Sequence, residues 1–452
     1  MNARAAPALR IARQAASILV GQVAVIGYAV ADTVMTGRHD SAGLAALAVG
    51  GAIYICVYLA LTGVLQALIP VVGHRHGASD AEGVRHGFQQ GCWLALALAL
   101  PGMALLLWPE PLLALTRSEP TVAEGARDYL YWLAWALPPG LLFRVYGAFN
   151  QGLSRPWAVT LLQLLALAAK LPLNAWLIFG GFGVPALGVA GCALATLIVQ
   201  GLLATTALAT LAAHPAYRPL RLYADWPPPR WAAQKELLRL GVPTAAALFF
   251  NISGFALMAV FIARFGTTPL AGHQIAANLA SVVYMLPLSI GIATSALTAQ
   301  ALGAGDPARA RLIWRQGLGL ALALVTLAGF ALALLREPLA RAYSADAAVQ
   351  AIAAHLLLFV AATQAFDALQ CVAGQALRAY RVALAPALTY GLGLWGVGLG
   401  GGYLLAYDSP SGWPAALSGP AAFWFANGAA LLLVGAVLLA MLARTSTPEP
   451  SR

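Results

Sequence analysis

Charged residues are scarce in this sequence of 452 residues. Asp, Glu, Lys and Arg make up 9% of the chain and hydrophobic residues 61%, against roughly 25% and 45–50% in ordinary soluble domains. Because the apolar residues recur along the whole chain, one membrane anchor joined to a soluble domain does not account for them. The composition therefore excludes a soluble protein and predicts that most of the chain lies in lipid.

The motifs of several enzyme classes are missing as well. No H-E-x-x-H, G-x-S-x-G or Walker-type G-x-x-x-x-G-K-[ST] pattern occurs, so hydrolysis within the membrane and ATP-driven transport lack their motifs. The four cysteines form no close pair, which gives neither a disulfide framework nor a zinc site. We therefore expect a protein that is not an enzyme and that holds no cofactor, with energy supplied by an ion gradient or a partner.

The basic residues do not indicate a nucleic-acid partner. The net charge is +10, and clustered Lys and Arg would raise the question of phosphate binding. Here they are scattered between apolar runs, as the positive-inside rule expects of cytoplasmic loops. We predict no nucleic-acid binding.

Twelve apolar runs are long enough to cross a bilayer, which needs about 20 residues in a helix. They lie at 13–37, 44–72, 87–108, 129–150, 157–180, 187–212, 237–265, 270–300, 312–335, 348–373, 382–406 and 420–443. A polar connector at 213–236, which contains Pro227-Pro228-Pro229, divides them six and six. The sequence predicts an all-α membrane protein with an N-lobe at 1–212 and a C-lobe at 237–452.

The basic residues also predict the orientation. With twelve spans the two ends of the chain share a side, and on that side eighteen Lys and Arg residues gather, including Arg4 and Arg452. The opposite loops receive only six, which are Arg38, Arg117, Arg127, Arg264, Arg336 and Arg341. We therefore expect a multi-pass inner-membrane protein with both termini in the cytoplasm.

The two halves resemble each other. A shift of 226 positions superposes the loop at 77–80 on 303–306, and also Arg85 on Arg311 and Tyr58 on Tyr284. Since each half has an even number of spans, the repeats share one orientation, and a pseudo-twofold axis along the membrane normal should relate the two six-helix bundles. Two such bundles would enclose a cavity that rocking exposes to each side in turn.

Only two acidic residues lie inside predicted spans. Of the sixteen Asp and Glu residues, fourteen fall in loops or near span ends, which leaves Asp32 in the first span and Asp367 in the tenth. An ionisable group within a span costs at least a few kcal/mol and is a functional hypothesis by default. Each carboxylate could bind a proton or a cation within its bundle; the alternative is a structural Asp that caps a broken helix or bonds to polar neighbours.

Polar side chains accompany both acids. Asn174 follows Pro172, which lacks a backbone N–H, and Thr196 lies on the sixth span; with Asp32 they offer the hard oxygens that Na⁺ prefers. A locally satisfied kink is the alternative. In the second half, four amides could face a substrate cavity or hold helices together: Asn251, Gln274, Asn278 and Gln364. For the cations Arg144 and Lys170 we expect snorkelling to the interface rather than a role in the site.

The stretches around these residues carry a family resemblance. Asp32-Thr33-Val34-Met35-Thr36-Gly37, the run from Gly266 to Asn278, Pro287-Leu288-Ser289-Ile290-Gly291 and Phe366-Asp367-Ala368-Leu369-Gln370 resemble the multidrug and toxic compound extrusion (MATE) family. The resemblance covers nearly the whole chain and is nearest to the bacterial NorM-like branch. It implies a two-lobed, twelve-helix antiporter that expels cationic, amphipathic compounds in exchange for Na⁺ or H⁺, with coupling residues at Asp32, Asn174, Thr196 and Asp367.

The sequence departs from the family pattern at two positions. Where NorM-like members often have a Glu in the seventh span, Asn251 stands, and where a second acid can follow the Asn of the fifth span, Ile178 stands. Because both departures remove negative charge, we expect coupling to centre on Asp32, with H⁺ favoured over Na⁺.

Two other functions remain open from the sequence. A lipid-linked precursor flippase of the same wider superfamily would share the helical layout, although such proteins tend to need several cations facing the cavity. A membrane enzyme or channel is the second, although neither a catalytic constellation nor a repeated pore motif is visible. Small-molecule substrates and membrane lipids are the expected partners, and we expect a monomer.

Overall fold

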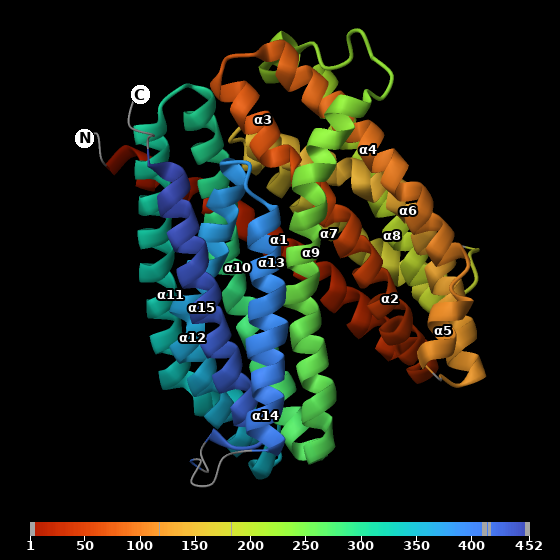
Figure 1. The fold of residues 1–452 in the computed structure, drawn as a ribbon. Coiled ribbons are helices and arrows are strands. Elements are labelled where there is room, and N and C mark those ends of the chain that lie inside the picture. The colour runs from red at the N-terminus through yellow and green to blue at the C-terminus, as the bar shows by residue number, and fades with distance from the viewer. Residues whose placement is uncertain (1–4, 117, 182, 409–413, 415–416, 448–452) are drawn as a thin grey trace. The chain divides into compact units, whose positions relative to one another are not determined.

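The computed structural model of the protein describes residues 5–116, 118–181, 183–408, 414 and 417–447, and it is drawn in Figure 1. Three residues used for the orientation, Arg4, Arg117 and Arg452, lie outside this part. Within the described residues, the only strand-like feature is an isolated bridge between Gly181 and Val184. All other regular structure is helical.

The chain forms two compact units, and the first is Ser17–Ala245. Its helices are α1 (Ala5–His39, from residue 17 on), α2 (Ser41–Leu65), α3 (Leu68–Gly77), α4 (Ala81–Leu107), α5 (Glu110–Thr116), α6 (Pro120–Gly152), α7 (Pro156–Phe179), α8 (Gly188–Ala213), η1 (Pro215–Leu220) and the start of α9 (Trp231–Ile262).

The second unit combines Ala246–Arg452 with the first sixteen residues. It contains the rest of α9, η2 (Ala263–Phe265), α10 (Thr267–Gly303), α11 (Pro307–Tyr343), α12 (Ala347–Ala379), α13 (Leu384–Tyr390), η3 (Gly391–Gly400), α14 (Gly401–Tyr407) and α15 (Pro420–Ser446). In Figure 1, α12 runs alongside α11 and α15, and it packs against both of them. The structure thus divides the chain within α9, after the polar connector.

Each of the twelve predicted spans is helical, which confirms the all-α membrane fold. Ten helical segments of the described chain are long and apolar enough to cross a membrane on their own. The other two predicted spans correspond to α6, which has Pro138 and Pro139 in its interior, and to the succession α13, η3 and α14. The sequence did not predict α5, nor η1 within the connector.

The eleventh predicted span departs most from a plain helix, because η3 is a π-helix of ten residues rich in glycine. A Cβ atom at Gly393 would collide with the Val434 side chain, and one at Gly402 would lie 2.7 Å from Phe423 Cδ1. These glycines therefore let η3 and α14 approach α15 closely. Because glycine has no Cβ atom, neither η3 nor α14 places a side chain at its contact with α15.

The predicted second span is interrupted. Helix α2 ends at Leu65 and α3 begins at Leu68. Pro70 then falls in the first turn of α3, where a backbone N–H would have no partner within the helix, so the proline suits a helix start better than a helix interior. Gln66 and Ala67 keep right-handed helical backbone angles, so the interruption is a break in the α-helical hydrogen bonds and not a loop.

The internal repeat is visible in the backbone hydrogen bonds of two turns. The amides of Ala78, Ser79 and Asp80 bond to the carbonyls of His74, His76 and Arg75, and the amides at 304, 305 and 306 bond in the same way to 300, 302 and 301. Ser79 and Gly305 both have positive φ, 57° and 73°. Asp80 and Asp306 then each cap the following helix by accepting from the backbone amide three residues on, at 2.7 and 2.8 Å.

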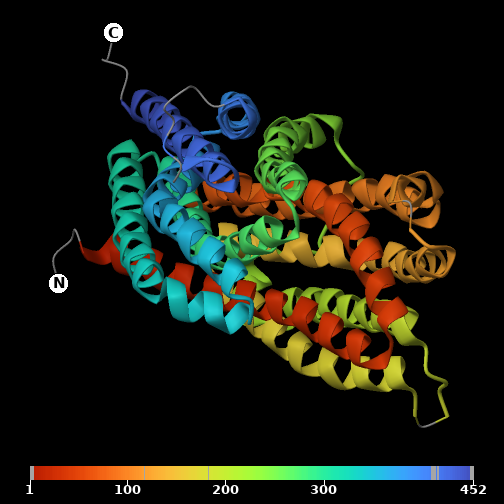
Figure 2. The same cartoon turned by 90° about the horizontal axis from the view of Figure 1, so that it is seen from below.

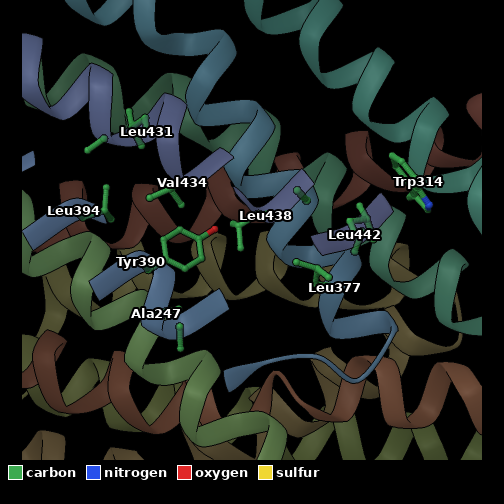
Figure 3. Close-up of a cluster of buried hydrophobic side chains, with 13 residues drawn as sticks. Ala247, Trp314, Leu377, Tyr390, Leu394, Leu431, Val434, Leu438 and Leu442 are labelled. Atoms are coloured by element: carbon green, nitrogen blue, oxygen red, sulfur yellow. The ribbon is translucent and has the colours of Figure 1, made fainter. Parts of the chain in front are cut away.

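The second unit has a large apolar core. Leu377 of α12, Tyr390 of α13, Leu394 of η3 and Val434 and Leu438 of α15 are all buried and gather in one cluster, which Figure 3 shows together with Trp314 and Ala247. Burying apolar side chains contributes about 25 cal/mol for each Å² removed from water, and within a bilayer the same side chains contribute mainly through close packing. This cluster fixes α12, the helix that carries Asp367.

The connector is bound to α4 in the first unit. Gln89 Nε2 donates to the carbonyls of Leu222 and Ala224, both at 3.0 Å, and Gln90 Nε2 donates to that of Pro228 at 3.2 Å. Trp93 Nε1 donates to the carbonyl of Pro227 at 2.9 Å. Prolines supply carbonyl acceptors without a competing N–H, so the three side chains of α4 hold the segment by its free acceptors.

Candidate functional site

Three helices of the unit 17–245 bring four polar side chains together. Asp32 comes from α1, Lys170 and Asn174 from α7, and Thr196 from α8. In Figure 2 the beginning of the chain, drawn in red, runs beside α7, drawn in yellow. Asp32, Thr196 and the α7 pair Lys170 and Asn174 are far from one another in the sequence. They meet because the fold brings α1, α7 and α8 together.

Both oxygens of the Asp32 carboxylate are engaged. Lys170 Nζ donates to Asp32 Oδ2 at 2.8 Å, and Asn174 Nδ2 donates to Asp32 Oδ1 at 2.7 Å. The three side chains are buried, with exposed fractions of 9% for Asp32, 3% for Lys170 and 0% for Asn174. A buried charge of either sign costs several kcal/mol unless it is paired and hydrogen-bonded. Each charge therefore compensates the other, which lowers the free-energy cost of burying both side chains.

Lys170 has two further neighbours. Its ammonium donates to Thr196 Oγ1 at 2.8 Å, and the Thr196 hydroxyl donates in turn to the carbonyl of Cys192 at 3.1 Å. The ammonium also lies 5.7 Å from the centroid of the Tyr28 ring, within the range of a cation–π interaction. Tyr28 is held in place by its hydroxyl, which donates to the carbonyl of Gln163 at 2.6 Å.

Helical spacing explains why these side chains share one side. Lys170 and Asn174 are four residues apart on α7, as are Tyr28 and Asp32 on α1, and residues at that spacing project from the same face of a helix. Pro172 lies between the two α7 residues inside a helix that runs on to Phe179. Because proline has no N–H, α7 lacks one internal hydrogen bond beside the site.

The structure corrects the interpretation of Lys170. We expected this cation to snorkel to the membrane interface, but it is buried and bonds to Asp32 and Thr196. The sequence held one usable signal, which is the spacing of four residues between Lys170 and Asn174. It could not show that the face carrying both residues turns towards Asp32.

The surroundings of Asp367, in the unit 246–452, are different. Asp367 lies on α12, where its Oδ1 accepts from Gln370 Nε2 at 2.6 Å, and the Gln370 carbonyl accepts from the Tyr390 hydroxyl at 3.0 Å. Its side chain is half-buried. In the part of the chain that the structure describes, Asp367 forms no ion pair.

The four amides of the second half occupy separate places in the same unit. Asn251 is half-buried on α9, and Gln274 is exposed on α10. Asn278 is exposed on α10 and its Oδ1 accepts from the Tyr343 hydroxyl at 3.2 Å. Gln364 is 3% exposed on α12, three residues before Asp367, and its Oε1 has no hydrogen-bond partner among the described residues. No hydrogen bond joins any two of the four within the described ranges.

Comparison with known proteins gives consistent matches. The MatE family model matches residues 17–176 and 243–404. The probable multidrug resistance protein NorM of Aromatoleum aromaticum is 43% identical over 441 residues, which is 98% of this chain and 95% of the relative. The multidrug resistance protein PmpM of Pseudomonas aeruginosa is 35% identical, over 94% of this chain and 88% of the relative.

Solved structures match in fold. The Vibrio cholerae MATE transporter VcmN in its bent form has a TM-score of 0.86 at 18% identity, covering 99% of this chain and 98% of that one. The eukaryotic MATE transporter AtDTX14 has a TM-score of 0.83 at 18% identity, covering 98% and 96%. The whole chain therefore has the architecture of these transporters.

Proposed function

Because this chain belongs to the MatE family of multidrug and toxic compound extrusion transporters, we propose that it exports cationic, amphipathic compounds in exchange for a cation, by alternating access. It is a multi-pass membrane transporter and not an enzyme. The antiport mechanism, the coupling ion and the residues that carry them are the proposal.

One observation carries the proposal, which is the buried carboxylate of Asp32. It lies 2.8 Å from Lys170 Nζ and 2.7 Å from Asn174 Nδ2, inside one helical unit. An acid in such a place is costly to maintain and is therefore a functional candidate. A carboxylate that is alternately loaded and empty is what an exchanger needs, because its two states can favour two arrangements of the helices. We assign coupling to Asp32 first, with Asn174 and Thr196 as its supporting residues.

We propose H⁺ rather than Na⁺ as the coupling ion. Both departures from the family pattern remove negative charge, since Asn251 provides an amide where a Glu could have stood in the seventh span and Ile178 is apolar where an acid could have followed Asn174 on α7. A site that holds Na⁺ generally needs several oxygen ligands with negative charge among them. Coupling through Asp32 alone requires only that one proton is taken up and released.

The test is transport by the purified protein in lipid vesicles. An imposed pH gradient should drive movement of a fluorescent lipophilic cation such as ethidium, and an imposed Na⁺ gradient at fixed pH should not. Asp32→Asn should abolish the response. Asp40→Asn is a matched control, because Asp40 is exposed at the cap of α2 and Asn keeps one of its two accepting oxygens. Transport driven by Na⁺ alone would overturn the choice of ion, and full activity of Asp32→Asn would overturn the site.

We further propose that the protein lies in the inner membrane as a monomer surrounded by lipid, with both termini in the cytoplasm and the lobes 1–212 and 237–452 as the rocking halves. The support is the eighteen-to-six distribution of Lys and Arg between the two sets of loops. Single cysteines introduced near either end should react with a membrane-impermeant thiol reagent in inverted vesicles and not in intact cells.

A further inference from the structure

We propose that Lys170 is a resident counter-cation of Asp32, and that its ammonium occupies the place where a metal cation would bind. In this role Lys170 is a specificity-determining residue: it excludes Na⁺ from Asp32 and leaves the proton as the cation that this carboxylate can accept. The inference deepens the proposed function and depends on it for its consequences in transport, whereas the binding test below is independent of transport.

The first argument is geometric. The oxygens that could coordinate Na⁺ near Asp32 are those of its carboxylate, of Thr196 and of Asn174, whose Oδ1 is buried without a hydrogen-bond partner among the described residues. Lys170 Nζ is 2.8 Å from one carboxylate oxygen and 2.8 Å from Thr196 Oγ1. The other carboxylate oxygen already accepts from Asn174 Nδ2 at 2.7 Å. This amide points its donor group, not its carbonyl, at the acid. A metal ion would have to displace the ammonium and turn the amide.

The second argument is electrostatic. Asp32 and Lys170 together carry no net charge, so a Na⁺ ion added beside them would leave one uncompensated positive charge in a buried place. The ammonium and the metal ion would also repel each other at short range in surroundings of low dielectric constant. A proton adds the same unit of charge, so the net charge alone does not distinguish the two ions. The proton differs because it binds to one carboxylate lone pair, needs no shell of oxygen ligands and does not have to fit between the ammonium and the acid.

The third argument is that Lys170 is held in place rather than merely near the acid. Its ammonium is fixed by Asp32 and Thr196, and the Tyr28 ring lies 5.7 Å away. That ring is fixed in turn by the hydrogen bond from Tyr28 to the Gln163 carbonyl at 2.6 Å. Lys170 itself is 3% exposed. A long flexible side chain loses considerable entropy in such a position, so the fixed placement indicates a strong interaction with its partners.

The experiment measures Na⁺ binding by the thermal stability of the purified full-length protein in detergent. A ligand that binds only the folded state raises the unfolding midpoint. At constant ionic strength, replacing choline chloride by NaCl should leave the wild-type midpoint unchanged. Lys170→Met, which removes the charge and keeps an apolar stem, should gain a Na⁺-specific rise of about 2 °C or more. The double variant Asp32→Asn with Lys170→Met should lose that rise.

The chain offers a matched control and a second variant. Lys235, the only other lysine, is exposed at the start of α9, so Lys235→Met should behave as wild type. Should Lys170→Met fail to fold, Lys170→Gln replaces it, because the amide keeps two N–H donors while the charge is gone. This variant should gain the same rise in Na⁺.

Two outcomes would overturn the inference. One is a Na⁺-specific rise of equal size in wild type and in Lys170→Met, and the other is no rise in a folded Lys170→Met or Lys170→Gln. Either could occur while proton-driven transport and its loss in Asp32→Asn stand. Conversely, the proposed function could fail in vesicles while the Na⁺ response of the variants appears as expected.

Discussion

The two acids within predicted spans, Asp32 and Asp367, lie in contrasting surroundings. Asp32 has both oxygens bound, one by a cation and one by an amide, whereas Asp367 is half-buried with a single amide donor from its own helix. The internal repeat does not relate them, because at the shift of 226 positions the residue that matches Asp32 is the apolar Met258. The halves therefore share the geometry of their turns and helix caps but carry their acids at different positions.

The largest difference should appear in efflux itself. In cells made sensitive to toxic cations, Asp32→Asn should lower efflux to less than roughly a tenth of the wild-type rate, because it removes the carboxylate that we propose for coupling. Asp367→Asn should lower it less, since this acid has no fixed counter-charge to release. Growth inhibition and dye efflux from the same cells measure both. Intact resistance in both variants to every compound tested would mean that neither acid takes part.

A smaller effect concerns the stability of the two sites. Lys170→Met leaves the Asp32 carboxylate buried without its counter-charge and should cost about 3–5 kcal/mol. Gln370→Leu removes the one amide donor of Asp367 and should cost about 1–3 kcal/mol. The comparison is read from the unfolding midpoints in detergent without Na⁺. A larger loss of stability for Gln370→Leu than for Lys170→Met would contradict the expected difference between the two sites.

Removing the hydroxyl of either tyrosine that supports a site should lower the stability by a similar amount. Tyr28 donates to the Gln163 carbonyl at 2.6 Å, and Tyr390 donates to the Gln370 carbonyl at 3.0 Å. Replacing either by Phe keeps the ring and removes one hydrogen bond, which should cost about 1 kcal/mol. Tyr28→Phe should keep the cation–π contact with Lys170 and most transport, whereas Tyr28→Leu should lower transport further. Equal transport in Phe and Leu variants would show that the ring does not matter.

The smallest effect separates the two repeated turns. Asp80 and Asp306 cap α4 and α11 in the same way, but Asp80 also pairs with Arg75 at 3.2 Å. Asn caps a helix as well as Asp does, so Asp306→Asn should leave stability unchanged. Asp80→Asn should cost at most about 1 kcal/mol, the range of an exposed ion pair. A larger loss at Asp306 would show that the turns are less alike than their hydrogen bonds.

Most of the fold could be predicted from the sequence because hydrophobic length determines a span almost by itself. Interruptions within a span were harder to predict. The interruption between α2 and α3 depends on Pro70, which is equally compatible with a kinked helix, and η3 depends on the packing of Gly393 and Gly402 against α15. Such features follow from contacts between helices that composition does not specify.

The candidate site was predicted in part. Asp32 stood out because an acid within an apolar run is costly, and Asn174 and Thr196 are indeed near it. For Lys170, which lies within the predicted span 157–180, we expected snorkelling because a long lysine side chain can reach the interface. Whether it does so or pairs with an acid depends on the rotation of α7 about its axis. That rotation cannot be predicted from a single sequence.

The segment held by Gln89, Gln90 and Trp93 has a consequence for the whole chain. Its sequence, polar and rich in proline, is typical of a flexible linker, but four of its carbonyls accept hydrogen bonds from side chains of α4. The segment is therefore a fixed part of the unit 17–245. Lengthening it between Leu222 and Arg230 would therefore unseat a fixed edge of the unit 17–245 instead of adding reach, and foreign sequence would be better tolerated before it, near the exposed His214.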